Sequence, residues 1–129
     1  MKFTYPKSEK LKRKKHIDLL FTEGKTVSKY PLRLVFVPIT DTNVTLEMGV
    51  SVSKKYFKKA VDRNYFKRVL RECYRKHQWI LKDALPQPYA LMFFYQTKER
   101  LSYQEIEERT QVLFEKFIKE INKEQSKEF

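Results

Sequence analysis

The sequence lacks several features on which whole classes of protein depend. It has one cysteine, Cys73, so neither a disulfide framework nor a cluster of thiolate metal ligands can form, and we expect a buried thiol there. It has no apolar run of about 18 residues, the length that crosses a bilayer. Residues 1–4 do not begin a signal peptide. These absences argue against a disulfide-stapled secreted domain and a membrane protein, and they predict a cytoplasmic location.

Acidic residues are also scarce, and their scarcity is uneven along the chain. The 129 residues include 28 Lys and Arg against 16 Asp and Glu, a net charge of +12. Residues 1–76 hold 20 basic and 7 acidic side chains, whereas residues 77–129 hold 8 and 9. Such an excess of one sign repels itself unless a polyanion neutralises it. Nucleic acid is therefore the expected partner, bound through the first three-fifths of the chain.

Length and composition predict one domain. Most domains have about 50–200 residues, so 129 residues suit a single core. Hydrophobic residues make up 41% of the chain and charged residues 34%, which allows a packed interior beneath a highly charged surface. We expect one domain over residues 1–129, with an ordered core at about 8–122 and a frayed polar tail at 123–129.

The spacing of apolar residues predicts a helix and two strands in the first half. Ile17, Leu20 and Phe21 line one face of a helix over residues 8–21. Gly24 is predicted to end it, because glycine tolerates the left-handed conformation. Alternating residues at 32–38 and 44–53 predict two strands, and the turn-like residues between them predict a hairpin.

A long helix, a buried strand and a packing helix are predicted in the second half. Residues 54–77 contain no Pro or Gly and favour one helix. Residues 89–95 form an apolar run that is typical of a central strand. Ser102 and Glu105 form a capping box that begins the last helix. The whole is an α+β arrangement, a mixed sheet with helices packed on it.

The helix over residues 54–77 is predicted to carry a cationic face. At about 100° per residue, six polar side chains share one arc: Arg63, Asn64, Lys67, Arg68, Arg71 and Arg75. The other arc is apolar: Tyr65, Phe66, Val69, Leu70 and Cys73. Like charges at this spacing repel, so a bound polyanion explains the arrangement better than the alternative, a solvated helix that serves solubility. Lys54 and Lys55 extend the surface, and Ser51 and Ser53 are candidate phosphate donors.

Two adjacent segments resemble the bacterial ribonuclease P protein family. Residues 49–55 are GVSVSKK and residues 60–72 are AVDRNYFKRVLRE. The family has a Gly-aliphatic-Ser-Val-Ser-Lys-Lys strand that leads to an Arg-Asn-Arg helix, followed by Lys-Arg and a further Arg. The similarity extends over about residues 7–117.

The resemblance implies a fold more specific than the apolar patterns do. The family has an α-β-β-β-α-β-α sandwich, similar to some ribosomal proteins, around a mixed sheet of about four strands with a left-handed βαβ crossover. The apolar patterns yield only three strands. We therefore expect one of the long strand segments to be split in two.

The resemblance also implies a function. It predicts the non-catalytic protein subunit of an endoribonuclease that removes the 5′ leader of precursor tRNA, with catalysis by the RNA subunit. The RNA subunit would bind the basic helix, and the leader would lie in a cleft whose matching residues are Ile17, Phe21, Arg33 and Val35. Phe21 has an alternative assignment to the core. Mg²⁺ would be held mainly by the RNA subunit and the substrate, and no metal site is predicted in the protein.

The sequence departs from the family pattern in two places. Tyr65 stands where the family usually has the second Arg of Arg-Asn-Arg, and we assign it no RNA contact. The loop at residues 56–59 has one extra residue in place of a frequent Gly. The start of the basic helix is therefore expected to be reshaped.

Other functions also suit a basic α/β domain. One is a structural ribosomal or RNA-assembly protein without a processing role. Another is a DNA-binding protein, which is disfavoured because the cationic arc offers few side chains suited to base edges. Unaided RNA cleavage is not expected, and no catalytic residue is assigned, because His16 and His77 lie on separate predicted helices and no acidic cluster suggests a two-metal site.

Overall fold

The protein's structure is a computed structural model that describes residues 7–126, with side chains described as far as residue 123. The predictions made for residues 1–4 and for the last three residues of the tail lie outside it. Its elements follow the expected α-β-β-β-α-β-α order. They are η1 (Lys7–Glu9), a 3-10 helix, then α1 (Lys14–Glu23), β1 (Lys25–Lys29), β2 (Leu32–Pro38), β3 (Leu46–Val52), α2 (Ala60–Lys82), β4 (Tyr89–Tyr95) and α3 (Tyr103–Ser126).

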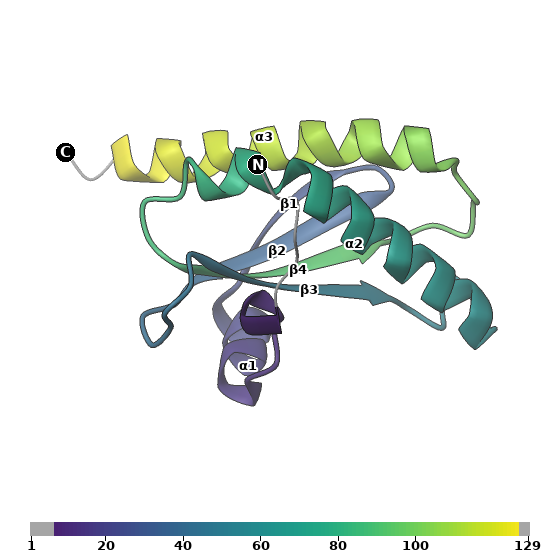
Figure 1. Ribbon diagram of the computed structural model, residues 1–129, viewed down its shortest axis with the longest axis horizontal. Helices are drawn as coiled ribbons and strands as arrows, with labels where there is room; N and C mark the ends of the chain where they lie inside the picture. Colours follow the sequence, from purple (N-terminus) through teal and green to yellow (C-terminus); the bar gives the residue numbers. More distant parts are fainter. Residues whose placement is uncertain (1–6, 127–129) are drawn as a thin grey trace.

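The four strands form one mixed sheet in the order β1-β2-β4-β3. β2 pairs antiparallel with β1 and with β4, whereas β3 and β4 are parallel. α2 connects these two parallel neighbours, so the expected βαβ crossover is present, while its left hand stays a prediction. α2 and α3 cover one face of the sheet, and α1 lies on the other side (Figure 1).

Strand pairing corrects two sequence predictions. The predicted hairpin between residues 32–38 and 44–53 is wrong, because β4 lies between β2 and β3. A strand that is apolar along its whole length is best buried at the centre of a sheet, and β4 displaces the hairpin for that reason. The fourth strand does not arise by splitting a long segment either. It is β1, which was not predicted because Val27 alone of its five residues is buried.

The core lies between the sheet and the helices α2 and α3. Leu34 and Phe36 of β2 are buried there, as predicted, and the Phe36 ring meets the ring of Phe117 at a centroid distance of 4.7 Å. α3 contributes five buried apolar side chains: Ile106, Leu113, Phe114, Phe117 and Ile121. Cys73 is fully buried, and burial raises the pKa of its thiol to about 12, which confirms the prediction of a buried thiol.

Gly24 ends α1, but not for the predicted reason. Its backbone is extended, with φ −66° and ψ 141°, rather than left-handed. A Cβ at this position would lie 2.2 Å from the carbonyl oxygen of Leu20 and 2.7 Å from a methyl carbon of Val35. The glycine is needed because the chain passes closely between its own helix and the neighbouring strand.

The helix boundaries differ from the predicted ones at four ends. α1 begins at Lys14 rather than at residue 8, because residues 7–9 form the separate 3-10 helix η1. α2 begins at Ala60 rather than at residue 54 and continues to Lys82. α3 begins with the predicted capping box, in which the backbone N–H of Glu105 donates to the Ser102 hydroxyl at 3.2 Å and the backbone N–H of Ser102 donates to the Glu105 carboxylate at 3.2 Å. α3 then continues to Ser126, into the segment predicted to be a frayed tail.

Candidate nucleic-acid interface

The first half of α2 presents a row of unpaired cations. Arg68 and Arg71 are exposed, and Lys67 is half-buried at the same side of the helix. None of these three side chains has an ion pair or hydrogen bond with any residue that the structure describes. Asn64 is exposed beside them. We call Lys67, Arg68 and Arg71 the cationic row.

Two other predicted members of the cationic face have partners within the protein. The Arg63 guanidinium donates to the backbone carbonyls of Phe57, at 2.9 Å, and Lys58, at 2.7 Å. Arg75 is ion-paired with Glu72 one turn earlier, and this hydrogen bond holds the pKa of the Glu72 carboxyl below its usual value. Arg63 therefore anchors the loop before α2, and Arg75 has a local counter-charge that the cationic row lacks.

The loop between β3 and α2 carries four exposed lysines. They are Lys54, Lys55, Lys58 and Lys59. The Ser53 hydroxyl accepts from the backbone N–H of Lys55 at 3.1 Å, so it already stabilises the turn. Phe57 is buried and stacks on Phe66 at a centroid distance of 4.7 Å. This apolar anchor shapes the loop and holds its lysines beside the start of α2.

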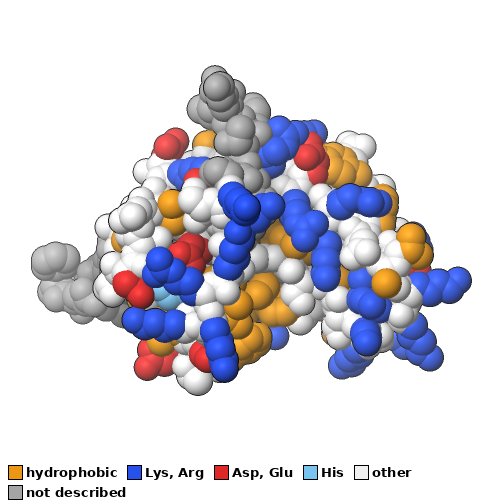
Figure 2. Space-filling view, turned by 60° about the horizontal axis from the view of Figure 1, so that its bottom comes forward, with side chains coloured by type: hydrophobic (Ala, Val, Ile, Leu, Met, Phe, Trp, Pro, Cys, Tyr) orange, Lys and Arg blue, Asp and Glu red, His pale blue; other side chains and the backbone are white. Residues whose placement is uncertain are grey.

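The sheet face turned away from the core is only partly covered. α1 covers one end of it, where Leu20 packs in a small cluster with Val37, Ile39 and Ala90. Strand register continues this face through Val35, Met92 and Gly49, and then through Arg33, Phe94 and Ser51. These side chains are half-buried. Figure 2 shows hydrophobic side chains exposed on this side of the molecule between groups of Lys and Arg.

Two of the four predicted cleft residues lie on this open face, and the other two lie on α1, which covers one end of it. Arg33 and Val35 lie on it, and the Arg33 guanidinium lies 5.7 Å from the centre of the Phe94 ring. Ile17 and Phe21 are one turn apart on α1, and Phe21 is 72% exposed. The alternative assignment of Phe21 to the core is therefore wrong.

Sequence reasoning missed Met92 and Phe94, which lie on the open face. They belong to β4, whose continuous apolar sequence suggested burial on both faces. The alternation of fully buried and half-buried residues along β4 became visible only in the structure. No sequence signal separates these two residues from Leu91 and Phe93, because all four are large and apolar.

A cavity of about 350 Å³ joins the open face to the cationic row. It is lined by Lys10, Leu11, Lys12, Met48, Gly49, Val50, Arg71 and Met92. A Cβ at Gly49 would lie 3.1 Å from the Met92 sulfur and 3.2 Å from a methyl carbon of Leu11. Glycine therefore lets Leu11 of the N-terminal segment and Met92 of β4 pack closely over this point of β3.

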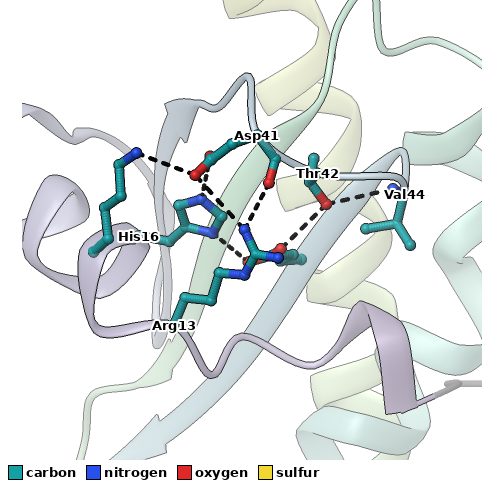
Figure 3. A network of polar contacts seen from close by, with 7 residues as sticks. Arg13, His16, Asp41, Thr42 and Val44 are labelled. Carbon is teal, nitrogen blue, oxygen red and sulfur yellow. Dashed lines mark hydrogen bonds and ion pairs between the residues drawn. The ribbon is translucent and has the colours of Figure 1, made fainter.

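A buried network fixes α1 against the sheet (Figure 3). The His16 ring is fully buried, with Nδ1 2.6 Å from a Glu47 carboxylate oxygen and Nε2 2.7 Å from an Asp41 carboxylate oxygen. Burial alone would lower the pKa of His16, but hydrogen bonds to Asp41 and then Glu47 outweigh it, and the pKa is raised. Both ring nitrogens then donate, which requires the protonated imidazolium.

Neighbouring groups complete this network. Lys15 lies 3.1 Å from the Asp41 carboxylate, and the hydrogen bonds from His16 and then Lys15 hold the pKa of Asp41 well below its usual value. Arg13 donates to the Asp41 backbone carbonyl at 2.7 Å, and the Thr42 hydroxyl donates to Glu47 at 3.2 Å. The network therefore connects α1, β3 and the loop after β2 into one unit that borders the open face.

The arrangement offers little for metal binding by the protein itself. Within residues 7–126, no three His, Cys, Asp or Glu side chains are grouped to hold a metal ion. His77 lies on α2, with its Nε2 3.3 Å from a carboxylate oxygen of Glu107 on α3. His16 of α1 contacts Glu47 instead, so the two histidines have different partners. None of the described helices is long and apolar enough to span a bilayer.

Known proteins are similar to this chain in sequence and in fold. A family model described as Ribonuclease P matches residues 5–118. The chain belongs to the ribonuclease P protein family. The ribonuclease P protein component of Porphyromonas gingivalis is 40% identical over 102 residues, which cover 77% of this chain and 74% of that protein. The component from Dictyoglomus turgidum is 36% identical over 83 residues, covering 64% and 67%.

Solved structures of this family have the same fold. The ribonuclease P protein of Thermotoga maritima superposes with a TM-score of 0.67 at 23% identity, covering 84% of this chain and 96% of that one. The Staphylococcus aureus protein gives a TM-score of 0.67 at 18% identity, covering 81% and 91%. Membership of the ribonuclease P family implies an RNA partner, a part in tRNA processing and a place in an endoribonuclease holoenzyme.

Proposed function

We propose that this chain is the protein subunit of ribonuclease P that binds the catalytic RNA subunit and the 5′ leader of precursor tRNA, and so promotes endonucleolytic removal of the leader in the cytoplasm. The observation that supports this most directly is the placement of the unpaired cationic row of α2 beside a partly open apolar sheet face. A family member with these two surfaces side by side has a place for a folded RNA and for a single strand.

The two surfaces suit different parts of the nucleic acid. Lys67, Arg68 and Arg71 are spaced to meet phosphates of the structured RNA subunit, with Asn64, Lys54 and Lys55 beside them. Phe94, Met92 and Val35 offer apolar contact to unstacked bases of the leader, while Arg33 and Ser51 reach its backbone. Such contacts hold a single strand with little preference for its sequence.

In this proposal the protein supplies binding and positive charge, and RNA supplies catalysis. The catalytic Mg²⁺ would be held mainly by phosphates of the RNA subunit and the substrate, because Mg²⁺ prefers oxygen ligands. The cationic row lowers the repulsion between two RNA molecules. Less Mg²⁺ is then needed to bring the leader and the catalytic RNA together.

A cleavage assay tests this proposal. A bacterial ribonuclease P RNA is incubated with precursor tRNA at low Mg²⁺, with and without this chain, and the release of the 5′ leader is followed. We expect the chain to stimulate cleavage at low Mg²⁺ and to have a smaller effect at high Mg²⁺. If it gives no stimulation at any Mg²⁺ concentration, a structural role in ribosome or RNA assembly becomes the better explanation.

A further inference from the structure

Two exposed apolar side chains interrupt the charged surface in the first two turns of α2. Val61 is 68% exposed and Tyr65 is 39% exposed, although the sequence placed Tyr65 on the apolar arc. They are four residues apart, so they lie next to each other on the helix surface, and Arg68 follows Tyr65 by three residues. The proposed contacts of the cationic row and of the open sheet face use neither of them.

The Tyr65 ring is supported from below. Its centroid lies 4.9 Å from that of Phe66, with the two planes at 86°, an edge contact. Phe66 is fully buried and packs against the rings of Phe57, at 4.7 Å, and Tyr95, at 4.5 Å. Tyr65 is therefore held in a defined position by the core rather than projecting freely into solvent.

The surroundings of this ring are cationic. Arg68 follows it on the helix, and the exposed Lys58 and Lys59 immediately precede α2. Arg100 lies 5.3 Å from the centre of the Phe66 ring and is ion-paired with Asp62 at 3.1 Å. An apolar protein partner would have to bury Arg68, Lys58 and Lys59 without counter-charges, whereas a polyanion with flat apolar groups matches both these charges and the ring.

We infer that Tyr65, with Val61 beside it, is a stacking platform for one unpaired base of the RNA subunit. This inference rests on the proposed function, because it assigns a further contact to the surface that binds that RNA. The family pattern usually has an arginine at this position. A contact between arginine and phosphate weakens as salt rises, whereas stacking of the Tyr65 ring on a base depends on salt much less. The reshaped loop is part of the same arrangement, because Phe57 of that loop supports Phe66.

Binding to the RNA subunit as a function of salt tests the inference. Affinities of the unmodified chain, Tyr65→Ala and Tyr65→Phe for a bacterial ribonuclease P RNA are measured at a series of KCl concentrations. We expect Tyr65→Ala to bind about 5- to 150-fold more weakly with an unchanged slope of log affinity against log salt, because stacking releases no counterions. Tyr65→Phe keeps the ring and should bind like the unmodified chain.

Controls separate this outcome from others. Val112→Ala changes an exposed apolar residue of α3 and should leave RNA binding unchanged. Thermal unfolding of each variant shows whether removing the ring from Phe66 disturbs the fold. Chemical probing of the RNA should show one unpaired nucleotide that the unmodified chain protects and Tyr65→Ala does not. The inference would be overturned if Tyr65→Ala bound RNA as tightly as the unmodified chain, or if Tyr65→Phe were weakened as much as Tyr65→Ala. It would also be overturned if Tyr65→Ala left RNA binding unaffected but abolished binding of a protein partner.

Failure of the proposed function gives a different result. In that case the unmodified chain itself would not stimulate cleavage of precursor tRNA at low Mg²⁺. If it does stimulate cleavage and Tyr65→Ala does so equally at every salt concentration, the proposed function stands and the stacking platform is wrong.

Discussion

Two charged regions of the molecule differ in whether their charged side chains have partners within the protein. At the base of α1, His16 is fully buried and both of its ring nitrogens meet carboxylates. In the first half of α2, Lys67, Arg68 and Arg71 have no counter-charge among the described residues. Buried charges need partners to offset the loss of water, whereas exposed charges can remain unpaired until a ligand arrives. The comparison separates the charges of the His16 network, which stabilise the fold, from those of the cationic row, which are open to a ligand.

The same contrast appears along α2 itself. Tyr74 and Gln78 follow Lys67 and Arg71 by seven residues, and so lie on the same side of the helix, yet both are buried. Glu9 of η1 contacts this part of the helix, accepting from the Tyr74 hydroxyl at 3.1 Å and pairing with Lys82 at 2.7 Å. Glu9 of the N-terminal segment and Glu72 of α2 itself thus pair with Lys82 and Arg75 in the second half of α2, and the cationic row lies in the first half.

Removing the buried imidazole should give the largest effect on stability. His16→Ala leaves the carboxylates of Glu47 and Asp41 without their shared partner, and loss of one member of a buried ionic group costs about 3–5 kcal/mol. Urea denaturation at pH 6 measures this change in the free energy of unfolding. His77→Ala, which removes the other histidine and its half-buried contact with Glu107, should cost far less. Similar costs for the two variants would contradict the special role of the His16 network.

Removing two open cations should instead affect RNA binding and leave stability unchanged. Lys67→Ala with Arg71→Ala should weaken RNA binding by roughly 100-fold and lower the salt slope by about two units, one for each phosphate that is no longer neutralised. The matched control is Lys119→Ala with Lys123→Ala, which removes the same charge from exposed positions on α3. A similar weakening in both variants would mean that net charge, rather than the cationic row, governs binding.

The buried network should also give the protein a pH dependence. The pKa of His16 is raised in the folded state, so its contribution is fully present below the unfolded pKa of about 6.5 and is lost as pH rises through the folded pKa. The difference in unfolding free energy between the unmodified chain and His16→Gln should therefore shrink as the pH is raised from 6 to 9, by at most about 1.4 kcal/mol per pH unit. Urea titrations at several pH values measure it, and a constant difference would count against a protonated His16.

Arg63 lies between the two categories and sharpens the comparison. Because its guanidinium donates to two loop carbonyls, Arg63→Ala should lower stability by about 1 kcal/mol. It should reduce the salt slope less than Lys67→Ala does, since part of its hydrogen-bonding capacity is already used within the protein. Paired denaturation and RNA titrations compare the variants. Unchanged stability, together with a salt slope lowered by a full unit, would show that Arg63 acts like a member of the cationic row.

Patterns of neighbouring residues predicted the elements that depend on local spacing. The capping box at Ser102 and Glu105, the cationic face of α2 and the burial of Leu34 and Phe36 follow from periodicity along one segment. Strand pairing did not follow, because it depends on which distant segments compete for the centre of the sheet. β1 was missed because a polar edge strand with one buried residue has no distinctive pattern.

The sequence by itself determined that the protein binds RNA and belongs to the ribonuclease P family. Charge segregation and the GVSVSKK and basic-helix motifs are local properties of the chain, so they can be recognised without the fold. Only the tertiary structure decided which cations are open. Arg63, Arg71 and Arg75 look equivalent on a helical wheel, but the Phe57 loop and Glu72 engage two of them and leave the third. Likewise, only the folded structure leaves Phe94 half-buried on the open face and packs Tyr65 against Phe66, because solvent access depends on what the rest of the chain covers.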